Sequence, residues 1–168
     1  MPWETTLERA EEDKREGKAP TTQAGEFVKE EMEHVRRGKH GVENTKQAIA
    51  IGLSKARRAG VDLPPPKKGR TSEKTRKSAK SAYRKGHSSA RKKKPSRKRS
   101  QAIEGALKRM PHKAASKEAL SRQAHEAAKR RGSASRKQAA QKAVHTKGQA
   151  GRKRVAKKAA RTREKEAA

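Results

Sequence analysis

The apolar residues between positions 22 and 37 recur at the spacing of an α-helix. They stand mostly three or four residues apart, which gathers them into one stripe. The stripe consists of Ala24, Phe27, Val28, Met32 and Val35. A thinner stripe over residues 5–16 predicts a shorter helix before it, ended by Gly17 and Pro20.

Residues 45–59 form a third helical pattern with two chemically different sides. At about 100° per residue, one side is apolar and the opposite side is mainly basic. The apolar side carries Ala48, Ile49, Gly52, Leu53, Ala56 and Ala59, and the opposite side carries Lys46, Gln47, Ser54, Arg57 and Arg58. The second and third helices are therefore predicted to pack as an αα-hairpin across residues 38–44. Its expected core is Phe27, Val28, Met32, Val35, Ile49, Leu53 and Ala56.

A helix with a basic side could instead read DNA bases, as the second helix of a helix-turn-helix does. That motif joins its helices by a turn of about three or four residues. Here seven or eight residues separate the two helices. We therefore expect residues 45–59 to pack through one side and to contact phosphates through the other, without reading bases.

The helical pattern breaks at the segment VDLPPPKKGR, where three consecutive prolines cannot continue a helix. The ordered domain is expected to end here. Residues 74–100 are a low-complexity mixture of Lys, Arg, Ser and Ala, expected to be extended or partly helical. The last third alternates alanine with basic residues in four pieces of about helical length, divided at Pro111, Gly132 and Gly148. Its residue types favour helix, but isolated helices of about 12–15 residues are marginal.

These patterns predict an all-α protein without a β-sheet. Residues 1–20 would hold an acidic N-terminal helix and residues 21–63 the hairpin unit. Residues 64–100 would form a Pro/Lys/Ser-rich basic linker. Residues 101–168 would form an Ala/Lys/Arg-rich tail, either disordered or folded into short helices, with helix favoured once phosphates neutralise its charge.

Composition limits the size of the core. Of the 168 residues, 29% are hydrophobic and 2% aromatic, and the formal net charge is +30. The charge is unevenly divided. Residues 1–43 hold 8 basic and 11 acidic residues, a net charge of −3, whereas the remaining residues hold 40 basic and 7 acidic residues, a net charge of +33. This asymmetry points to a polyanionic partner for the basic part.

Duplex DNA is the expected partner. It carries one charge per about 1.7 Å, so 33 positive charges would match roughly 56 Å of duplex, on the order of 16 base pairs. RNA is the alternative, although modules that read RNA sequence generally stack bases on aromatic residues, and Tyr83 is the only aromatic residue after position 44. The expected contact residues are Lys46, Gln47, Arg57, Arg58, Lys67, Lys68, Arg70, Lys74, Arg76, Lys77, Arg84, Lys85, Arg91, Lys92, Lys93, Lys94, Arg97, Lys98, Arg99, Arg136, Lys137, Arg152, Lys153 and Arg154.

Catalytic, cofactor and metal chemistry find no support in the sequence. There is no cysteine, the six histidines have no metal-binding spacing, and no glycine-rich phosphate loop is present. The carboxylates are expected to be helix-surface charges. No apolar run approaches the roughly 20 residues of a membrane span, and no signal-peptide pattern begins the chain. We therefore expect no small-molecule ligand and a cytoplasmic location on the nucleoid.

Residues 26–79 resemble a family of small, basic bacterial proteins that is defined only as a domain of unknown function. The shared features are a KHG turn, a KQAIAIxLSxARRAG helix and a following Pro/Lys-rich segment. The resemblance implies a bacterial protein, and members are sometimes described as DNA-binding. The C-terminal half is similar to bacterial histone H1-like tails in composition only. The expected function is non-enzymatic, histone-like DNA binding; an RNA- or ribosome-associated protein and a stress or interaction protein acting through its acidic head are the alternatives.

Overall fold

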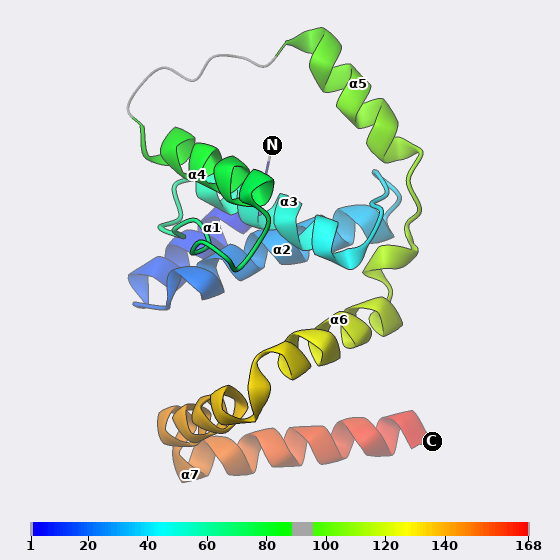
Figure 1. Ribbon diagram of the computed structural model, residues 1–168. Coiled ribbons are helices and arrows are strands. Elements are labelled where there is room, and N and C mark those ends of the chain that lie inside the picture. Colours follow the sequence, from blue (N-terminus) through cyan, green and yellow to red (C-terminus); the bar gives the residue numbers. More distant parts are fainter. Residues whose placement is uncertain (1, 89–95, 168) are drawn as a thin grey trace. The chain divides into compact units, whose positions relative to one another are not determined.

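The computed structural model describes residues 2–88 and 96–167, and in these ranges it contains helices and no strand. The predicted all-α fold is confirmed. The chain divides into two compact units, residues 1–123 and 124–168. Figure 1 shows the succession of helices along the chain. They are α1 (Glu4–Arg15), α2 (Pro20–Arg36), α3 (Thr45–Arg58), α4 (Glu73–His87), α5 (Arg97–Lys108), the 3₁₀ turn η1 (Lys113–Ala115), α6 (Lys117–Arg130) and α7 (Gly132–Ala167).

The first three helices lie within two residues of the segments that the sequence predicts. Pro20 opens α2, where its missing N–H is not needed. Gly38 follows α2 with a φ of +71°, a left-handed conformation that favours glycine. Asn44 caps α3, because its side-chain oxygen accepts a hydrogen bond of 2.9 Å from the backbone N–H of Gln47.

The hairpin core lies between α2 and α3, and α1 packs on the same hairpin through α2. Of the expected core residues, Phe27, Met32, Val35 and Ala56 are buried, while Val28, Ile49 and Leu53 are partly buried against them. Gly52 marks the closest approach. A Cβ atom there would lie 2.7 Å from the Cα of Val28, so only glycine lets the two helices pack at this distance.

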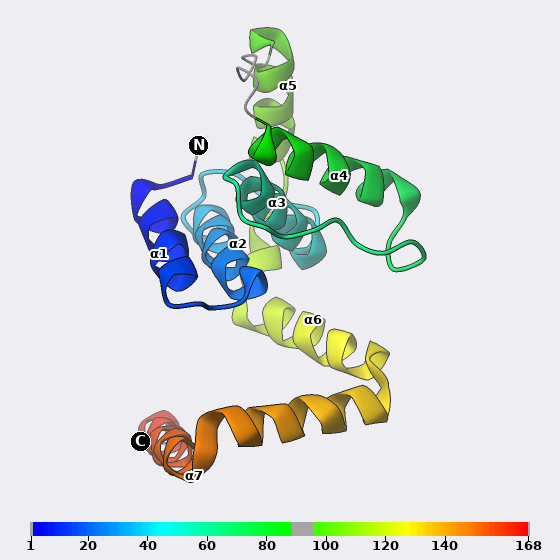
Figure 2. The same cartoon turned by 90° about the vertical axis from the view of Figure 1, so that its left-hand side faces the viewer.

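The packing continues beyond the prolines, where we expected the ordered domain to end. Helix α4 packs against α3 (Figure 2) and buries Ala79 and Ala82. A Cβ atom on Gly86 would stand 1.8 Å from the backbone oxygen of Arg57, so the two backbones are in direct contact. Prolines 64–66 therefore form a link between two packed helices. Small residues make this contact possible, and they contribute almost nothing to a hydropathy pattern.

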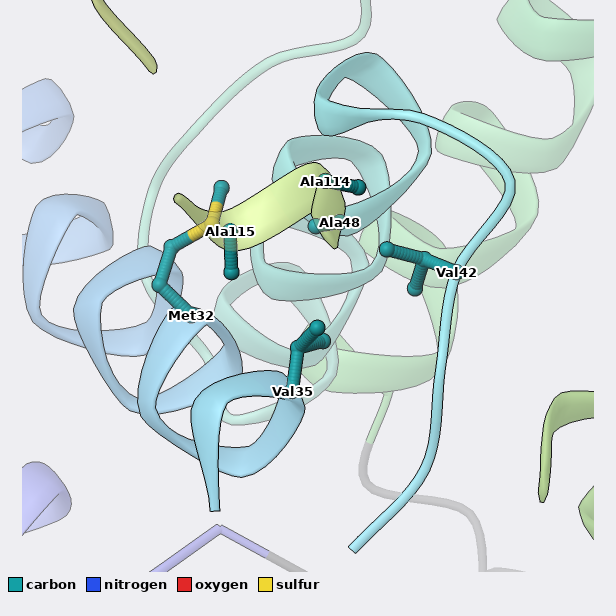
Figure 3. Packing of buried hydrophobic residues seen from close by; sticks show 6 residues of the cluster. All are labelled: Met32, Val35, Val42, Ala48, Ala114 and Ala115. Atoms are coloured by element: carbon teal, nitrogen blue, oxygen red, sulfur yellow. The ribbon is translucent and has the colours of Figure 1, made fainter. Parts of the chain in front are cut away.

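The last turn of α5 and the segment after it also pack on the hairpin. The backbone N–H of Gly41 donates to the carbonyl of Leu107 at 2.9 Å, and the Thr45 hydroxyl donates to the carbonyl of Ala114 at 2.7 Å. Ala114 and Ala115 are buried in one cluster with residues of α2, α3 and the turn between them (Figure 3). Residues 107–116, which the sequence assigned to the tail, thus belong to the packed first unit.

The second unit consists of the end of α6 and the 36-residue helix α7. Its backbone is helical except at Gly148, whose φ of 59° and ψ of −177° interrupt the helix. No side chain that the structure describes in α7 is buried. The predicted helical tail is confirmed, and the alternative of a disordered tail is wrong for these residues.

Candidate nucleic-acid interface

Most of the predicted contact residues are exposed on helices or on the segment after α3. In the first unit they are Lys46, Arg58, Lys67, Lys68, Arg70, Lys74, Lys77, Arg84, Lys85, Arg97, Lys98 and Arg99, and in the second unit Arg136, Lys137, Arg152, Lys153 and Arg154. Gln47 and Arg76 are partly exposed. Arg91, Lys92, Lys93 and Lys94 lie outside the described residues.

Arg57 does not lie on the exposed outer face of α3, so the prediction that places it there beside Arg58 is wrong. Its side chain is turned inward and the residue is only 7% exposed. The guanidinium donates to the carbonyls of Leu63 at 3.0 Å and Pro64 at 3.5 Å, and burial lowers the pKa of Arg57. The reason is the proline segment, which folds back over the end of α3 and presents carbonyls that need donors.

Gln47 also stabilises the start of α3 through hydrogen bonds. Its side-chain oxygen accepts a hydrogen bond of 2.7 Å from the backbone N–H of Glu43, while its own backbone N–H donates to the Asn44 side chain. The arrangement is similar to a capping box, which satisfies free N–H groups at a helix start. Lys46 and Arg58 are the residues of α3 that present exposed positive charge from the predicted contact set.

Helix α4 carries a basic face on the side away from α3. Lys74, Lys77, Arg84 and Lys85 fall within roughly 100° of one another around the helix axis, and all four are exposed. The Ser72 side chain caps this helix by accepting a 3.2 Å hydrogen bond from the backbone N–H of Thr75. The packed alanine side thus holds α4 in place, and the basic side is open to solvent.

Tyr83 is not an open platform for a nucleic-acid base. Its ring stacks on His87, with centroids 4.0 Å apart and planes at 22°. Its hydroxyl donates to the carboxylate of Asp62 at 2.5 Å, and this hydrogen bond raises the pKa of Tyr83. The described interface therefore offers charge, not aromatic stacking.

The tail repeats one local arrangement sixteen residues apart. Gly132 and Gly148 both have a positive φ, at 75° and 59°. Four residues after each glycine an arginine donates back to its carbonyl, Arg136 at 3.2 Å and Arg152 at 3.3 Å. The two segments that follow, SRKQAAQKA and GRKRVAKKA, are similar in sequence. Each of these two repeated segments thus follows a glycine with a positive φ and presents a cluster of exposed basic residues shortly after it.

Acidic residues do little to offset this charge. From position 64 onward the sequence holds 36 basic and six acidic residues. Three of the acidic residues form ion pairs within their own helices, namely Glu73 with Arg76 at 2.8 Å, Glu104 with Lys108 at 2.9 Å and Glu126 with Arg130 at 3.6 Å. Exposed pairs of this kind add about 0.3–0.5 kcal/mol to a helix, and they leave a large net positive charge.

A second charged group lies inside the hairpin, where the sequence predicted only surface carboxylates and scattered histidines. That expectation is wrong for Glu30 and Glu31, which are 2% and 0% exposed. Lys55 of α3 reaches both carboxylates, at 3.5 Å and 2.7 Å. His34 is buried beside them, and its burial, with the nearby Lys55 ammonium, lowers its pKa.

One signal in the sequence could have revealed this group. Glu31 and His34 stand three residues apart and share a helix face, and His40 follows directly after the turn at Gly38. Because the helix stripe was assigned from apolar residues alone, the polar members of the buried side were assigned to the surface.

Comparison with known proteins identifies a domain but no activity. Residues 19–69 match a family of unknown function, DUF6496. The matched part covers α2, α3, the turn between them and the proline segment, so the chain contains a DUF6496 domain there. The resemblance of this region to a domain of unknown function is thus confirmed. Neither a curated protein nor a solved structure matches the chain. Among the described residues, no helix is long and apolar enough to cross a membrane.

Proposed function

We propose that this protein is a non-enzymatic DNA-binding protein of the histone-like, nucleoid-associated kind, which contacts the phosphate backbone with little sequence preference. The observation that carries the proposal is the uneven charge, with 36 basic against six acidic residues from position 64 onward. Solubility of a small domain needs a net charge of only about 2–8. A location on the bacterial nucleoid would follow from this function.

Basic residues on the surface of helices are suited to contact the phosphate backbone of DNA for two reasons. Neutralising phosphates releases condensed counterions, which favours binding without regard to sequence. Apart from the partly exposed Arg76, the basic residues of α4 and α7 whose burial the structure describes are exposed, so their side chains extend toward solvent. The stacked and hydrogen-bonded state of Tyr83 argues against a base-stacking mode typical of single-strand binders.

Salt-dependent binding tests this proposal directly. Binding of the full chain to duplex DNA, duplex RNA and single-stranded DNA would be measured by fluorescence anisotropy between about 50 and 200 mM salt. For duplex DNA the logarithm of the binding constant should fall by about 0.9 for each phosphate contact and each logarithmic unit of salt. We expect a steep slope on duplex DNA of any sequence, and tighter binding there than to duplex RNA.

A triple variant defines the surface responsible. Replacing Arg152, Lys153 and Arg154 by glutamine should reduce the salt dependence of DNA binding by the amount expected for the loss of about two to three phosphate contacts. The matched control replaces Arg9, Lys14 and Arg15 of α1 by glutamine, which removes the same charge from the acidic part and should leave the slope unchanged. Equal losses in the two variants would show that net charge alone matters. Preferential binding to RNA would favour the RNA-associated alternative, and a shallow slope on every nucleic acid would favour a protein acting through its acidic head.

A further inference from the structure

The buried charged group of the hairpin contains three side chains that could ligate a metal ion. They are Glu31 and His34 of α2 and His40 of the following turn, and one ligand atom from each lies within 4.8 Å of the others. Glu31 Oε1 and His40 Nε2 are 3.2 Å apart. Ligands placed about 2.0–2.2 Å from a tetrahedral ion are separated by about 3.4 Å. Glu31 and His40 have the spacing that such an ion requires, and the His34 ligand atom lies within 4.8 Å of both.

The ring of His40 has the orientation of a metal ligand. Its Nδ1 lies 3.2 Å from the backbone oxygen of Gly41, and since a carbonyl can only accept, Nδ1 carries the proton. Its other ring nitrogen, Nε2, lies 3.2 Å from Oε1 of Glu31. Metal-bound histidines typically donate their other ring nitrogen to such a carbonyl.

The buried carboxylates are incompletely satisfied within the described part of the chain. Oε1 of Glu31, Oε1 of Glu30 and Nε2 of His34 are buried without a hydrogen-bond partner, whereas Oε2 of Glu31 has the Lys55 ammonium at 2.7 Å. Lys55 supplies one ammonium for the two buried carboxylates, and a buried carboxylate with too few partners is costly. A divalent cation would balance both carboxylates if the partly exposed Lys55 ammonium moved to solvent.

We propose that Glu31, His34 and His40 bind one divalent transition-metal ion and that Zn²⁺ is its best match. Two imidazoles and one carboxylate form a ligand set that suits Zn²⁺. The ion would join α2 to the turn that leads into α3 and would hold the hairpin closed. Lys55 would compete with the ion for the Glu31 carboxylate.

Zinc titration of the metal-free full chain tests this site. The protein would be treated with a chelator, dialysed and titrated with Zn²⁺ by calorimetry, while Trp3 fluorescence is recorded in parallel. Trp3 is the only tryptophan, and its ring lies 4.7 Å from that of His34. We expect one Zn²⁺ per chain, a change in Trp3 fluorescence at the same stoichiometry and a higher Tm with zinc.

Variants of the cluster separate this site from other histidines. His40→Asn and Glu31→Gln should each lower zinc affinity at least about tenfold. The matched control His125→Asn removes an exposed histidine of α6 and should bind zinc as the unaltered protein does. Equal zinc binding in His40→Asn and His125→Asn, or no uptake by the unaltered chain, would overturn the proposal.

Lys55→Gln provides a test in the opposite direction. Removing the competing ammonium should raise zinc affinity, whereas it lowers the Tm of the metal-free protein because the carboxylates lose their counter-charge. Unchanged or weaker zinc binding in this variant would contradict the proposed competition. Because this variant gains binding, its result does not depend on whether His40→Asn folds.

Discussion

The two units of the molecule are both helical, but for different physical reasons. Helix α2 buries Phe27 and Val35 completely and shares two hydrophobic clusters with α3. In α7 no described side chain is buried. Helix α2 is therefore stabilised by tertiary packing, whereas α7 depends on the intrinsic helix preference of Ala, Arg, Lys and Gln. The comparison teaches that a helical backbone alone does not imply a folded core.

The largest expected difference between the units comes from a core truncation. Phe27→Ala leaves a cavity at a fully buried site in the first unit, and such changes lower the free energy of unfolding by about 3–5 kcal/mol. Urea unfolding followed by Trp3 fluorescence would measure the loss. The circular dichroism signal of the tail should persist after the first unit has unfolded.

Val144→Ala in α7 is the matched control for that truncation. Val144 is 46% exposed, so its shortening should leave the urea midpoint unchanged. A loss of stability as large as that of Phe27→Ala would mean that the tail has a core of its own, and the contrast between the units would fail.

A smaller effect is expected where backbones touch within the first unit. Gly86→Ala would place a Cβ atom 1.8 Å from the backbone oxygen of Arg57, so α4 must shift away from α3. Overpacking of this kind typically costs about 1–3 kcal/mol in the free energy of unfolding. The control Gly105→Ala lies in α5, where the nearest atom to the new Cβ is 3.7 Å away. It should be neutral or stabilising by up to about 1 kcal/mol in chemical denaturation. Equal effects of the two changes would show that α4 does not pack on α3.

The neighbouring arginines of α3 separate stability from binding. Arg57→Met removes two hydrogen bonds to the proline segment and should lower the free energy of unfolding by about 1.5–3 kcal/mol. The salt slope of DNA binding should stay the same, because the side chain is buried. Arg58→Met should have the opposite effect. It should change the free energy of unfolding little, and it should reduce the salt dependence of DNA binding by the amount expected for about one phosphate contact. A reduced salt dependence of DNA binding in Arg57→Met would show that Arg57 contacts DNA despite its burial.

Much of the fold follows from local patterns in the sequence, and the remainder depends on contacts that those patterns do not record. The apolar stripes and helix ends predict α1, α2 and α3 to within two residues, and Gly132 and Gly148 mark breaks in the tail. The packing of α4 and of residues 107–116 rests on alanine and glycine, whose small size allows close approach. Such residues give only a weak hydrophobic signal unless larger apolar residues share their stripe.

The sequence predicts the presence of a basic surface more accurately than the exposure of each individual residue. Counting charges is sufficient to identify a basic surface, and most of the predicted residues are exposed. The prediction for Arg57 is wrong because a helical pattern cannot show that the proline segment following α3 folds back over the helix end. Glu30 and Glu31 were misassigned because their partner, Lys55, comes from another helix. Both errors concern tertiary partners of charged residues.

The smallest expected effect concerns the break inside α7. Gly148 has a φ of 59° and a ψ of −177°, a conformation essentially restricted to glycine. Gly148→Ala should therefore replace the break by continuous helix, with a preference of about 1 kcal/mol for the helical state. Circular dichroism at low temperature should show more helix, while the Tm of the first unit stays the same.

The control for this last change is Gly151→Ala, three residues further along α7. Gly151 has no positive φ, so alanine there adds helix propensity without removing a break. Gly148→Ala should increase helicity more than Gly151→Ala, because it also joins two helical segments and so avoids a second nucleation. If the two variants gain equally, the break at Gly148 has no influence on the tail, and α7 behaves as one helix governed by propensity alone.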